Sequence, residues 1–375
     1  MIKINKVKIL HFEITDTIGG IETFLFNLYE YIDRSRYEFE FITQFDNPAF
    51  EKEIISMGGK IHKVHSLKQP LLYCRDIVEI MKNGYDFIHL HKNSAINIFP
   101  YILAYSKYDG RIISHAHNTA PTCGGSLKFM HYINRYFLNK FSVYRFACSE
   151  LAGEWLYGMS RGFDIVKNGI DTDKYSFSLD TRKKLRDVLS IPQNAVVIGH
   201  IGRFVEQKNH KRILDIFEEV SKRQSNSYLL LIGKGELMDL IISSTQKSPA
   251  KKRILFLGER SDIPDLLSTM DIFLMPSLYE GLPISAIEAQ ASGLKLFLSD
   301  TISKETQLID DVKWFSLFDD NNRIVNQLIA DAEPNQSIFD RLKRNHLVKS
   351  SGFDIKSTVS HIDKIYLKLN QRLGN

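Results

Sequence analysis

Cysteine is scarce in this sequence and forms no recognisable motif. Only three of the 375 residues are cysteine, Cys74, Cys123 and Cys148, and no two of them form a CxxC pair. This spacing argues against a zinc ribbon, a redox motif or a disulfide framework, so we interpret the three side chains as core or half-buried thiols. A G-x-G-x-x-G motif is also missing after the first predicted strand, which counts against an NAD-dependent dehydrogenase.

Long hydrophobic runs and a strong net charge are missing too. No segment is long or apolar enough to span a bilayer, and no signal-peptide core follows the opening stretch MIKINKVKILHFEI. The formal net charge of +5 is small for this length and gives nucleic-acid binding little support. We therefore expect a cytoplasmic protein that binds no nucleic acid and whose only membrane contact would be peripheral.

A βα alternation of apolar runs and amphipathic stretches is present, and it starts twice. The first series contains VKILHFE, FEFIT, KIHKVH, DFIHLH, RIISHAH and YRFACS, and the second contains VVIGHIG, SYLLLIG, RILFLG, DIFLMPS and KLFLSD. Each series is typical of a parallel sheet covered by helices on both faces. The sequence therefore predicts an α/β protein of two Rossmann-like, doubly wound domains, 1–177 and 178–354, that face each other across a cleft. A C-terminal helix at about 355–375 is expected to join the first domain.

Two glutamates flank a predicted helix start in MPSLYEGLPISAIEAQASG, residues 275–293. Glu280 lies in the loop before the helix, Pro283 suits the first turn, and Glu288 lies within the helix. With a helical rise of about 1.5 Å per residue, the two carboxylates can lie roughly 8 to 12 Å apart. A sugar and a ribose at opposite ends of a diphosphate need hydrogen-bond acceptors at such a separation, and the helix start suits the diphosphate itself. Spacing alone fits a surface helix with two unrelated acids equally well.

Two cations lie in IGHIGRFVEQKNH, residues 198–210, where a predicted strand runs into a glycine turn. Arg203 and Lys208 follow the strand, and Asn209 is a plausible cap for the next helix. A departing nucleoside diphosphate develops negative charge, which two fixed cations at this position would stabilise. The other interpretation is a solvated basic turn.

A pair of glycines, Gly19 and Gly20, follows the first predicted strand in ITDTIGGIETFLFNLYEYI and precedes an amphipathic helix. Glycines let backbone amides approach a phosphate or an acceptor, and the helix adds the positive end of its dipole. The pair alone is weak evidence, because turns commonly contain one. Gly233, in LLLIGKGEL, also follows a predicted strand.

Together these segments resemble the retaining GT-B glycosyltransferases of the large group that includes sucrose synthases and bacterial polysaccharide glycosyltransferases, known as glycosyltransferase family 4. The EGxPxxxxEAxAxG signature of that group is matched by Glu280, Gly281, Pro283, Glu288, Ala289 and Gly293. GGIE, HAHN and the GRFVEQK turn also occur in the expected order. The resemblance implies a GT-B fold and a metal-independent, retaining transfer of a sugar from a nucleotide sugar to a glycan acceptor. Uridine is the commonest base in the group.

The resemblance also implies roles for individual residues. Arg203 and Lys208, at the R-x4-K spacing of the group, contact the donor phosphates, and His117 of HAHN faces the transferred sugar. Glu280 joins these three as the catalytic set. The implied donor-binding residues, which include main-chain contacts near the base, are Glu288, Gly281, Leu282, Gly19, Gly20, Gly233 and Ile263.

Histidines recur at two predicted strand ends, His89 with His91 and His115 with His117. Residues i and i+2 of a strand point the same way, so a four-histidine metal site is conceivable. The stretch after His91 offers no carboxylate or cysteine to complete such a site, so we interpret His89, His91 and His115 as structural. We expect neither a metal nor a cofactor.

No acidic residue occurs between Asp109 and Glu150. Within this stretch, GGSLKFMHYINRYFLNKF interleaves Lys128, Arg135 and Lys140 with aromatic and aliphatic residues. Such a helix could rest on anionic lipid at the inner face of the cell membrane, close to a polyprenyl-diphosphate-linked acceptor. Its apolar residues could equally belong to the core. The membrane interpretation suits capsule, exopolysaccharide or O-antigen assembly.

Two other functions fit a two-domain protein of this kind. A nucleotide-sugar epimerase of the same architecture would convert the donor without an acceptor, but we expect it to lack the Glu-x7-Glu segment that this chain contains. A sugar-nucleotide-binding protein without activity is the second alternative. Every charged residue expected of an active enzyme is present, which favours the glycosyltransferase.

Overall fold

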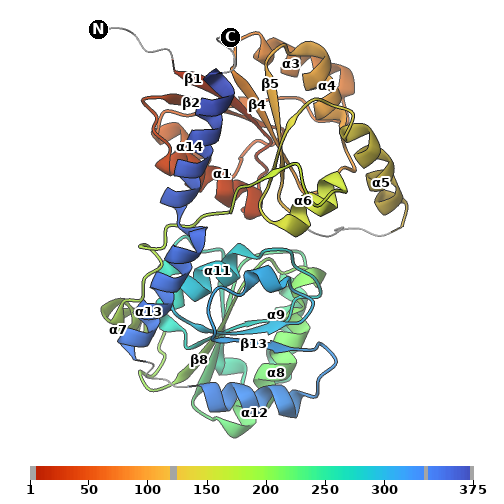
Figure 1. Cartoon of the computed structure of the whole chain (residues 1–375). Coiled ribbons are helices and arrows are strands. Elements are labelled where there is room, and N and C mark those ends of the chain that lie inside the picture. Colours follow the sequence, from red (N-terminus) through yellow and green to blue (C-terminus); the bar gives the residue numbers. More distant parts are fainter. Residues whose placement is uncertain (1–5, 119–124, 333–336, 372–375) are drawn as a thin grey trace. The chain divides into compact units, whose positions relative to one another are not determined.

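The computed structural model of the chain describes residues 6–118, 125–332 and 337–371. The chain divides into two compact units, Met1–Ile170 together with Ile355–Asn375, and Asp171–Asp354. Each unit holds one parallel sheet flanked by helices (Figure 1).

The sheet of the first unit has the strand order β3-β2-β1-β4-β5-β6-β7, and all neighbouring strands are parallel. Its strands are β1 (Val7–Phe12), β2 (Tyr37–Thr43), β3 (Lys60–Lys63), β4 (Phe87–Lys92), β5 (Arg111–Ala116), β6 (Tyr144–Ala147) and β7 (Asp164–Ile165). Its helices are α1 (Gly20–Tyr31), α2 (Glu51–Ser56), α3 (Pro70–Met81), α4 (Phe99–Lys107), α5 (Ser126–Leu138), α6 (Glu150–Tyr157) and α14 (Ile355–Gln371). The strand order reverses between β1 and β4, so this pair forms the topological switch point of the sheet.

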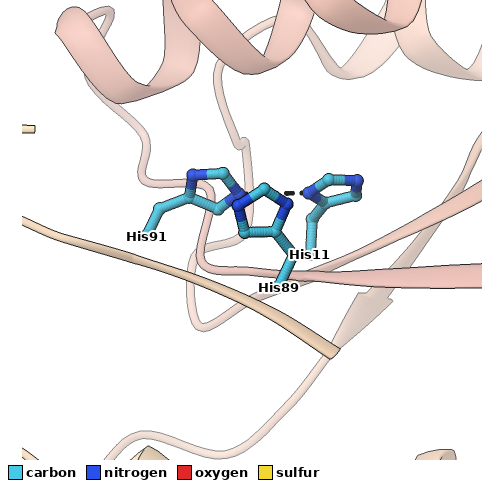
Figure 2. Close-up of side chains that lie close together, drawn as sticks. All are labelled: His11, His89 and His91. Carbon is cyan, nitrogen blue, oxygen red and sulfur yellow. Dashed lines mark hydrogen bonds between the residues drawn. The ribbon is translucent and has the colours of Figure 1, made fainter. Parts of the chain in front are cut away.

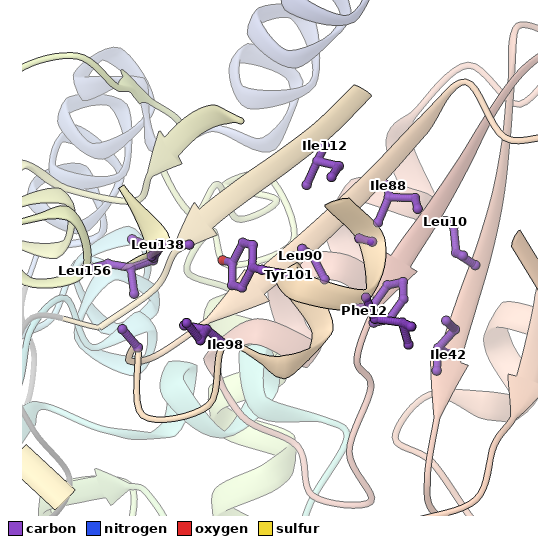
Figure 3. Packing of buried hydrophobic residues seen from close by; sticks show 14 of the residues in the cluster. Leu10, Phe12, Ile42, Ile88, Leu90, Ile98, Tyr101, Ile112, Leu138 and Leu156 are labelled. Atoms are coloured by element: carbon purple, nitrogen blue, oxygen red, sulfur yellow. The ribbon is translucent and has the colours of Figure 1, made fainter. Parts of the chain in front are cut away.

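Alternate residues of each strand pack on opposite faces of this sheet. Leu10 and Phe12 join a cluster with Leu90 of β4 and side chains of α3, α4 and α6, shown in Figure 3. Ile9 belongs to a second cluster, which contains Phe24 of α1 and side chains of α14. Burial on both faces explains why these strands read as nearly continuous apolar runs.

The C-terminal helix α14 packs beside α1 in the first unit (Figure 1). Its Ile362, Tyr366 and Leu369 are buried in the second of the two clusters. Asp363, on the same helix, accepts a hydrogen bond of 2.7 Å from the Tyr37 hydroxyl of β2. Apolar burial at helical spacing thus fixes the end of the chain to the unit in which it begins.

The sheet of the second unit has the strand order β10-β9-β8-β11-β12-β13 and is again parallel. Its strands are β8 (Val196–Ile201), β9 (Ser227–Ile232), β10 (Ile254–Gly258), β11 (Ile272–Met275), β12 (Lys295–Ser299) and β13 (Val312–Phe315). Its helices are α7 (Leu179–Val188), α8 (His210–Arg223), α9 (Met238–Ser244), α10 (Ile263–Thr269), α11 (Ile284–Ala291), α12 (Asn321–Asp331) and α13 (Ile338–Val348). The switch point lies between β8 and β11, which brings the loops after these two strands together.

A buried charge cluster fixes α7 to the second sheet. Asp271, just before β11, accepts hydrogen bonds from Arg182 at 2.5 Å and Arg186 at 2.9 Å, both of which lie on α7. Its Oδ2 also accepts from the backbone N–H of Val197 at 2.8 Å. All three side chains are buried, so each charge depends on the others for solvation.

The described cysteines form no disulfide bond. Cys74 and Cys148 are free, the first half-buried and the second buried. Cys123 lies outside the described residues. None of the helices described is both long enough and apolar enough to cross a bilayer.

Candidate active site

Lys208 and Glu280 meet at the switch point of the second sheet. Lys208 ends the 3-10 turn η1 (Glu206–Lys208) after β8, and Glu280 lies in the loop after β11. Lys208 Nζ donates to Glu280 Oε1 at 2.6 Å, and the two side chains are only 14% and 10% exposed. The prediction gave these residues separate contacts with the donor, and the structure joins them in one ion pair.

Hydrogen bonds between the two loops hold this pair in place. Leu278 N–H donates to the Gln207 carbonyl at 2.8 Å, and the Gln207 side chain donates to the Tyr279 carbonyl at 2.9 Å. The Asn209 side chain donates to the Pro276 carbonyl at 3.1 Å. Asn209 occupies the predicted N-cap position of α8, but its side chain makes no capping hydrogen bond to the helix. Its left-handed backbone, with a φ of 53°, instead aims the amide at the neighbouring loop.

Glu288 lies on α11 and is 8% exposed. Burial raises the pKa of its carboxyl group to about 7, although a hydrogen bond from Tyr175 acts in the opposite direction. The Tyr175 hydroxyl donates to Glu288 Oε1 at 2.7 Å. Pro283 occupies the position just before α11 rather than its first turn, and Gly281 and Leu282 lie between Glu280 and this helix start.

Glycine is required where the loops after β8 and β9 touch. A Cβ atom on Gly233 would lie 2.1 Å from the Gly202 carbonyl oxygen, and the φ of Gly233 is +135°. Arg203 is the residue after Gly202, and its side chain is exposed. Among the described residues, no acceptor or anion partners its guanidinium, which leaves this cation available to a ligand. Ile263 begins α10, after the loop that follows β10.

Gly19 and Gly20 lie at the start of α1, with Gly19 as the residue before the helix. Glu22 folds back over this turn, and its Oε1 accepts hydrogen bonds from the Thr15 hydroxyl at 2.7 Å and the Thr15 N–H at 3.2 Å. A Cβ atom on Gly19 would lie 2.9 Å from Glu22 Oε2. The GGIE pattern thus has a local structural reason, because the first glycine makes room for the glutamate that ties the loop together.

Five histidine rings lie in contact inside the first unit. His91 forms one N···N hydrogen bond with His11 at 3.1 Å (Figure 2) and another with His117 at 2.9 Å. His89 bonds the Tyr366 hydroxyl of α14 through Nδ1 at 2.9 Å. Burial lowers the pKa of both His11 and His117 to about 3, so these rings are neutral at physiological pH. Nε2 of His117 is engaged by His91, and its Nδ1 is buried rather than exposed to a ligand.

The same rings meet the geometry of a possible metal site. His11, His89 and His91 can bring three nitrogens within 4.8 Å of one another, and so can His91, His115 and His117. Both groups consist of histidine alone, so no negative ligand offsets a buried cation. Hydrogen bonding between neutral imidazoles already accounts for the close nitrogen pairs.

Helix α5 exposes most of its apolar side chains. Phe129 is 68% exposed and Tyr136 62%, and Met130, Ile133 and Phe137 are exposed as well. On this helix only His131 and Leu138 are buried. The alternative that these apolar residues form core is therefore wrong for most of the helix.

The basic side chains of this region lie against its aromatic residues. The Arg135 guanidinium lies 4.9 Å from the Tyr132 ring centroid, and Lys140 Nζ lies 4.9 Å from that of Tyr136. Lys128 is also exposed. Positive charge thus borders an apolar helix face.

Comparison with known proteins gives a consistent result over nearly the whole chain. Residues 18–174 match the family described as Glycosyltransferase Family 4, and residues 181–346 match the family described as Glycosyl transferases group 1. EpsF of Bacillus subtilis, which is named as a glycosyltransferase, is 32% identical over 76% of this chain and 77% of its own length. The UDP-Gal:alpha-D-GlcNAc-diphosphoundecaprenol alpha-1,3-galactosyltransferase of Escherichia coli is 24% identical over 97% of this chain and 98% of its own.

Solved structures agree on the fold. HepE of Anabaena in complex with UDP-glucose superposes with a TM-score of 0.81 over 96% of this chain and 99% of its own, at 19% identity. The two doubly wound sheets and this likeness confirm the predicted GT-B fold, and the match to EpsF confirms the predicted family. The chain belongs to the glycosyltransferases of family 4.

Proposed function

We propose that this glycosyltransferase moves a sugar from a UDP-sugar to a polyprenyl-diphosphate-linked glycan, with retention of configuration and without a metal. The observation that carries the proposal is the Lys208–Glu280 pair beside the start of α11, with Glu288 on the same helix. HepE, whose fold the chain shares, is described with UDP-glucose, and the Escherichia coli relative is named for a UDP-galactose donor and a diphosphoundecaprenol acceptor. In this proposal the second unit binds the donor and the first unit binds the acceptor.

The site residues divide the work along the donor. Arg203, Lys208 and the free N–H groups at the start of α11 neutralise the diphosphate, with Gly233 letting the backbone come close. Glu288 accepts hydrogen bonds from the ribose, and Glu280 accepts them from hydroxyls of the transferred sugar. The main chain at Ile263 contacts the base. We assign His117 to the transferred sugar, and the turn at Gly19 and Gly20 to the acceptor and the donor phosphates.

Transfer then proceeds on one face of the sugar. The bond between the anomeric carbon and the β-phosphate oxygen breaks through an oxocarbenium-like transition state, and the acceptor oxygen bonds that carbon from the same side. The acceptor's hydroxyl proton passes to the departing phosphate oxygen. A glycosidase-like alternative would need a carboxylate nucleophile about 5 Å from an acid. Glu280 is already paired with Lys208 and Glu288 with Tyr175, so neither is a free nucleophile.

A panel of nucleotide sugars tests the donor. Purified protein is incubated with UDP-, GDP- and ADP-linked hexoses, and the released nucleoside diphosphate is measured with and without EDTA. We expect slow hydrolysis of a UDP-sugar, undiminished by EDTA, because side chains supply the positive charge. Preference for GDP or ADP would overturn the uridine assignment, and loss of turnover in EDTA would overturn the metal-independent mechanism. Conversion of the donor to its epimer without release would favour the epimerase.

We further propose that α5 docks on an anionic membrane surface at the inner face of the cell membrane. The exposed apolar face and its bordering cations are the two features that such a surface recognises, and no acidic residue lies between Asp109 and Glu150 to repel it. A membrane-bound enzyme would meet a polyprenyl-linked acceptor at the surface where that acceptor resides.

Sedimentation with vesicles tests this docking. Replacing Lys128, Arg135 and Lys140 with serine should weaken binding to vesicles containing phosphatidylglycerol about a hundredfold, since each cation near such a surface contributes about 1 kcal/mol. The control replaces three exposed lysines of the second unit, Lys183, Lys184 and Lys211, with serine and should leave binding unchanged. Equal loss in both variants would show a non-specific charge effect, and no loss in the α5 variant would refute the docking surface.

A further inference from the structure

Tyr175 lies in the short segment that opens the second unit, and this segment is held firmly. The Asp171 carboxylate accepts the backbone N–H of Asp173 at 3.1 Å and of Lys174 at 3.2 Å, which closes a turn. The Thr172 hydroxyl donates to Asp354 Oδ2 at 2.6 Å in a buried contact. The backbone that carries the Tyr175 ring is therefore fixed before any ligand arrives.

The Tyr175 hydroxyl is the one hydrogen-bond donor that the described residues offer to the Glu288 carboxylate. It occupies Oε1 at 2.7 Å, and Oε2 accepts no hydrogen bond from the part of the chain that the structure describes. Among the residues that the structure describes, no cation forms an ion pair with this carboxylate. Arg341 and Arg344 of α13, which packs on α11, donate to the carbonyls of Ser292 and Gly293 at the far end of the helix. Burial raises the pKa of the Tyr175 hydroxyl, and the negative charges of Glu288 and Asp171 raise it further.

We propose that Tyr175 is a positioning residue for the ribose of the donor, because its hydroxyl holds one oxygen of Glu288 and keeps the carboxylate ionised with its other oxygen open to ligand hydroxyls. The inference rests on the proposed role of Glu288. An ionised carboxylate accepts hydrogen bonds at both oxygens, whereas a protonated one has an O–H that must itself find an acceptor. The ionised form therefore offers more acceptor sites to the two ribose hydroxyls than the protonated form.

The contact makes nucleotide binding depend on pH near neutrality. Burial raises the pKa of Glu288 to about 7, and the hydrogen bond from Tyr175 keeps it from rising further. Affinity for the nucleotide should therefore fall as the pH drops through 7. Replacing Tyr175 with phenylalanine removes the hydroxyl, raises the pKa of Glu288 and moves this loss of affinity to higher pH.

Calorimetric titration of UDP into the full-length protein between pH 6 and pH 9 tests this role. Tyr175→Phe should bind UDP about tenfold more weakly than the wild type at pH 6.5, as expected for a lost hydrogen bond to a charged group. The difference should nearly vanish at pH 9, where Glu288 ionises in both proteins. Tyr228→Phe, on β9 and away from these contacts, is the matched control and should follow the wild-type curve. The diphosphate of UDP also changes its protonation over this pH range, but this change affects binding to all three proteins equally and cancels in the comparison.

The pH profile separates positioning from simple support of the fold. Weakening by the same factor at every pH, or no weakening at all, would overturn the inference. Glu288→Gln separates it from the proposed function: if this change weakens UDP binding and Tyr175→Phe does not, only the role of Tyr175 is wrong. If Glu288→Gln leaves UDP binding unchanged, Glu288 does not bind the ribose and both proposals fall.

Discussion

Lys208→Ala should lower kcat for sugar transfer by a factor of about 100 to 1,000, and Glu280→Gln should lower it to a similar extent. The lysine is proposed to stabilise charge that develops on the leaving diphosphate, and removing one preorganised group of this kind typically has such an effect. The glutamine keeps the shape of Glu280 but cannot accept the same strong hydrogen bonds or pair with Lys208. The measurement is kcat and KM for donor and acceptor, with the melting temperature recorded for each variant.

The double variant distinguishes catalysis from support of the fold. Each single change leaves a nearly buried partner charge unpaired, so each should also lower the melting temperature. Combining Lys208→Ala with Glu280→Gln removes both charges and should restore part of that temperature while activity stays low. Activity that returned together with stability would show that the pair is structural only. Lys211→Ala, on the exposed start of α8, is the control and should leave kcat unchanged.

The sheet architecture was predictable because parallel strands are buried on both faces. Every apolar run predicted as a strand forms one, and both series give doubly wound sheets. β7 and β13 were not predicted, and both are edge strands. β7 contains only two residues, Asp164 and Ile165, and β13 exposes Lys313. An edge strand pairs with a neighbour on one side only and does not need a continuous apolar run. Neither strand therefore shows the apolar run from which the other strands were predicted.

The candidate site was predictable where its residues are close in sequence. Glu280 and Glu288 fall in one motif, and Arg203 and Lys208 fall in another. The partner of Glu288 was not found, because Tyr175 lies 113 positions away and belongs to a segment that reads as a polar linker. His11 was missed for the same reason, being 80 positions from His91. Its place one strand over from His89 in the register could have been inferred only once β1 was known to pair with β4.

Burial also changed the interpretation of residues that the motifs did identify. Sequence alone treats Glu288 as an ionised acceptor, but its surroundings raise its pKa to about 7, so its charge depends on conditions. His117 was expected to face the transferred sugar, and the structure shows one of its ring nitrogens bound to His91. Such properties follow from neighbours brought together by the fold, which a local motif cannot encode.

Asp271→Asn should destabilise the second unit by about 3 to 5 kcal/mol, the cost of breaking a buried ion pair. Arg182 and Arg186 would remain in place with their side chains 7% and 0% exposed and without the carboxylate that both contact. The neutral amide can accept a hydrogen bond, but it cannot balance two charges. Urea unfolding followed by the fluorescence of Trp314, on β13 of this unit, measures the change.

A matched substitution shows whether the effect belongs to the cluster. Asp180→Asn removes an exposed acid from the same helix that carries both arginines, and it should change the unfolding free energy by no more than about 0.5 kcal/mol. Trp155 lies in the first unit and reports on the unfolding of that unit. The first unit should unfold at the same urea concentration in the wild type and in both variants, unless the two units unfold together. A loss below about 1 kcal/mol in Asp271→Asn would mean that the backbone carbonyls accepting from Arg182 and Arg186, among them that of Thr269, solvate the two guanidinium groups without help from the aspartate.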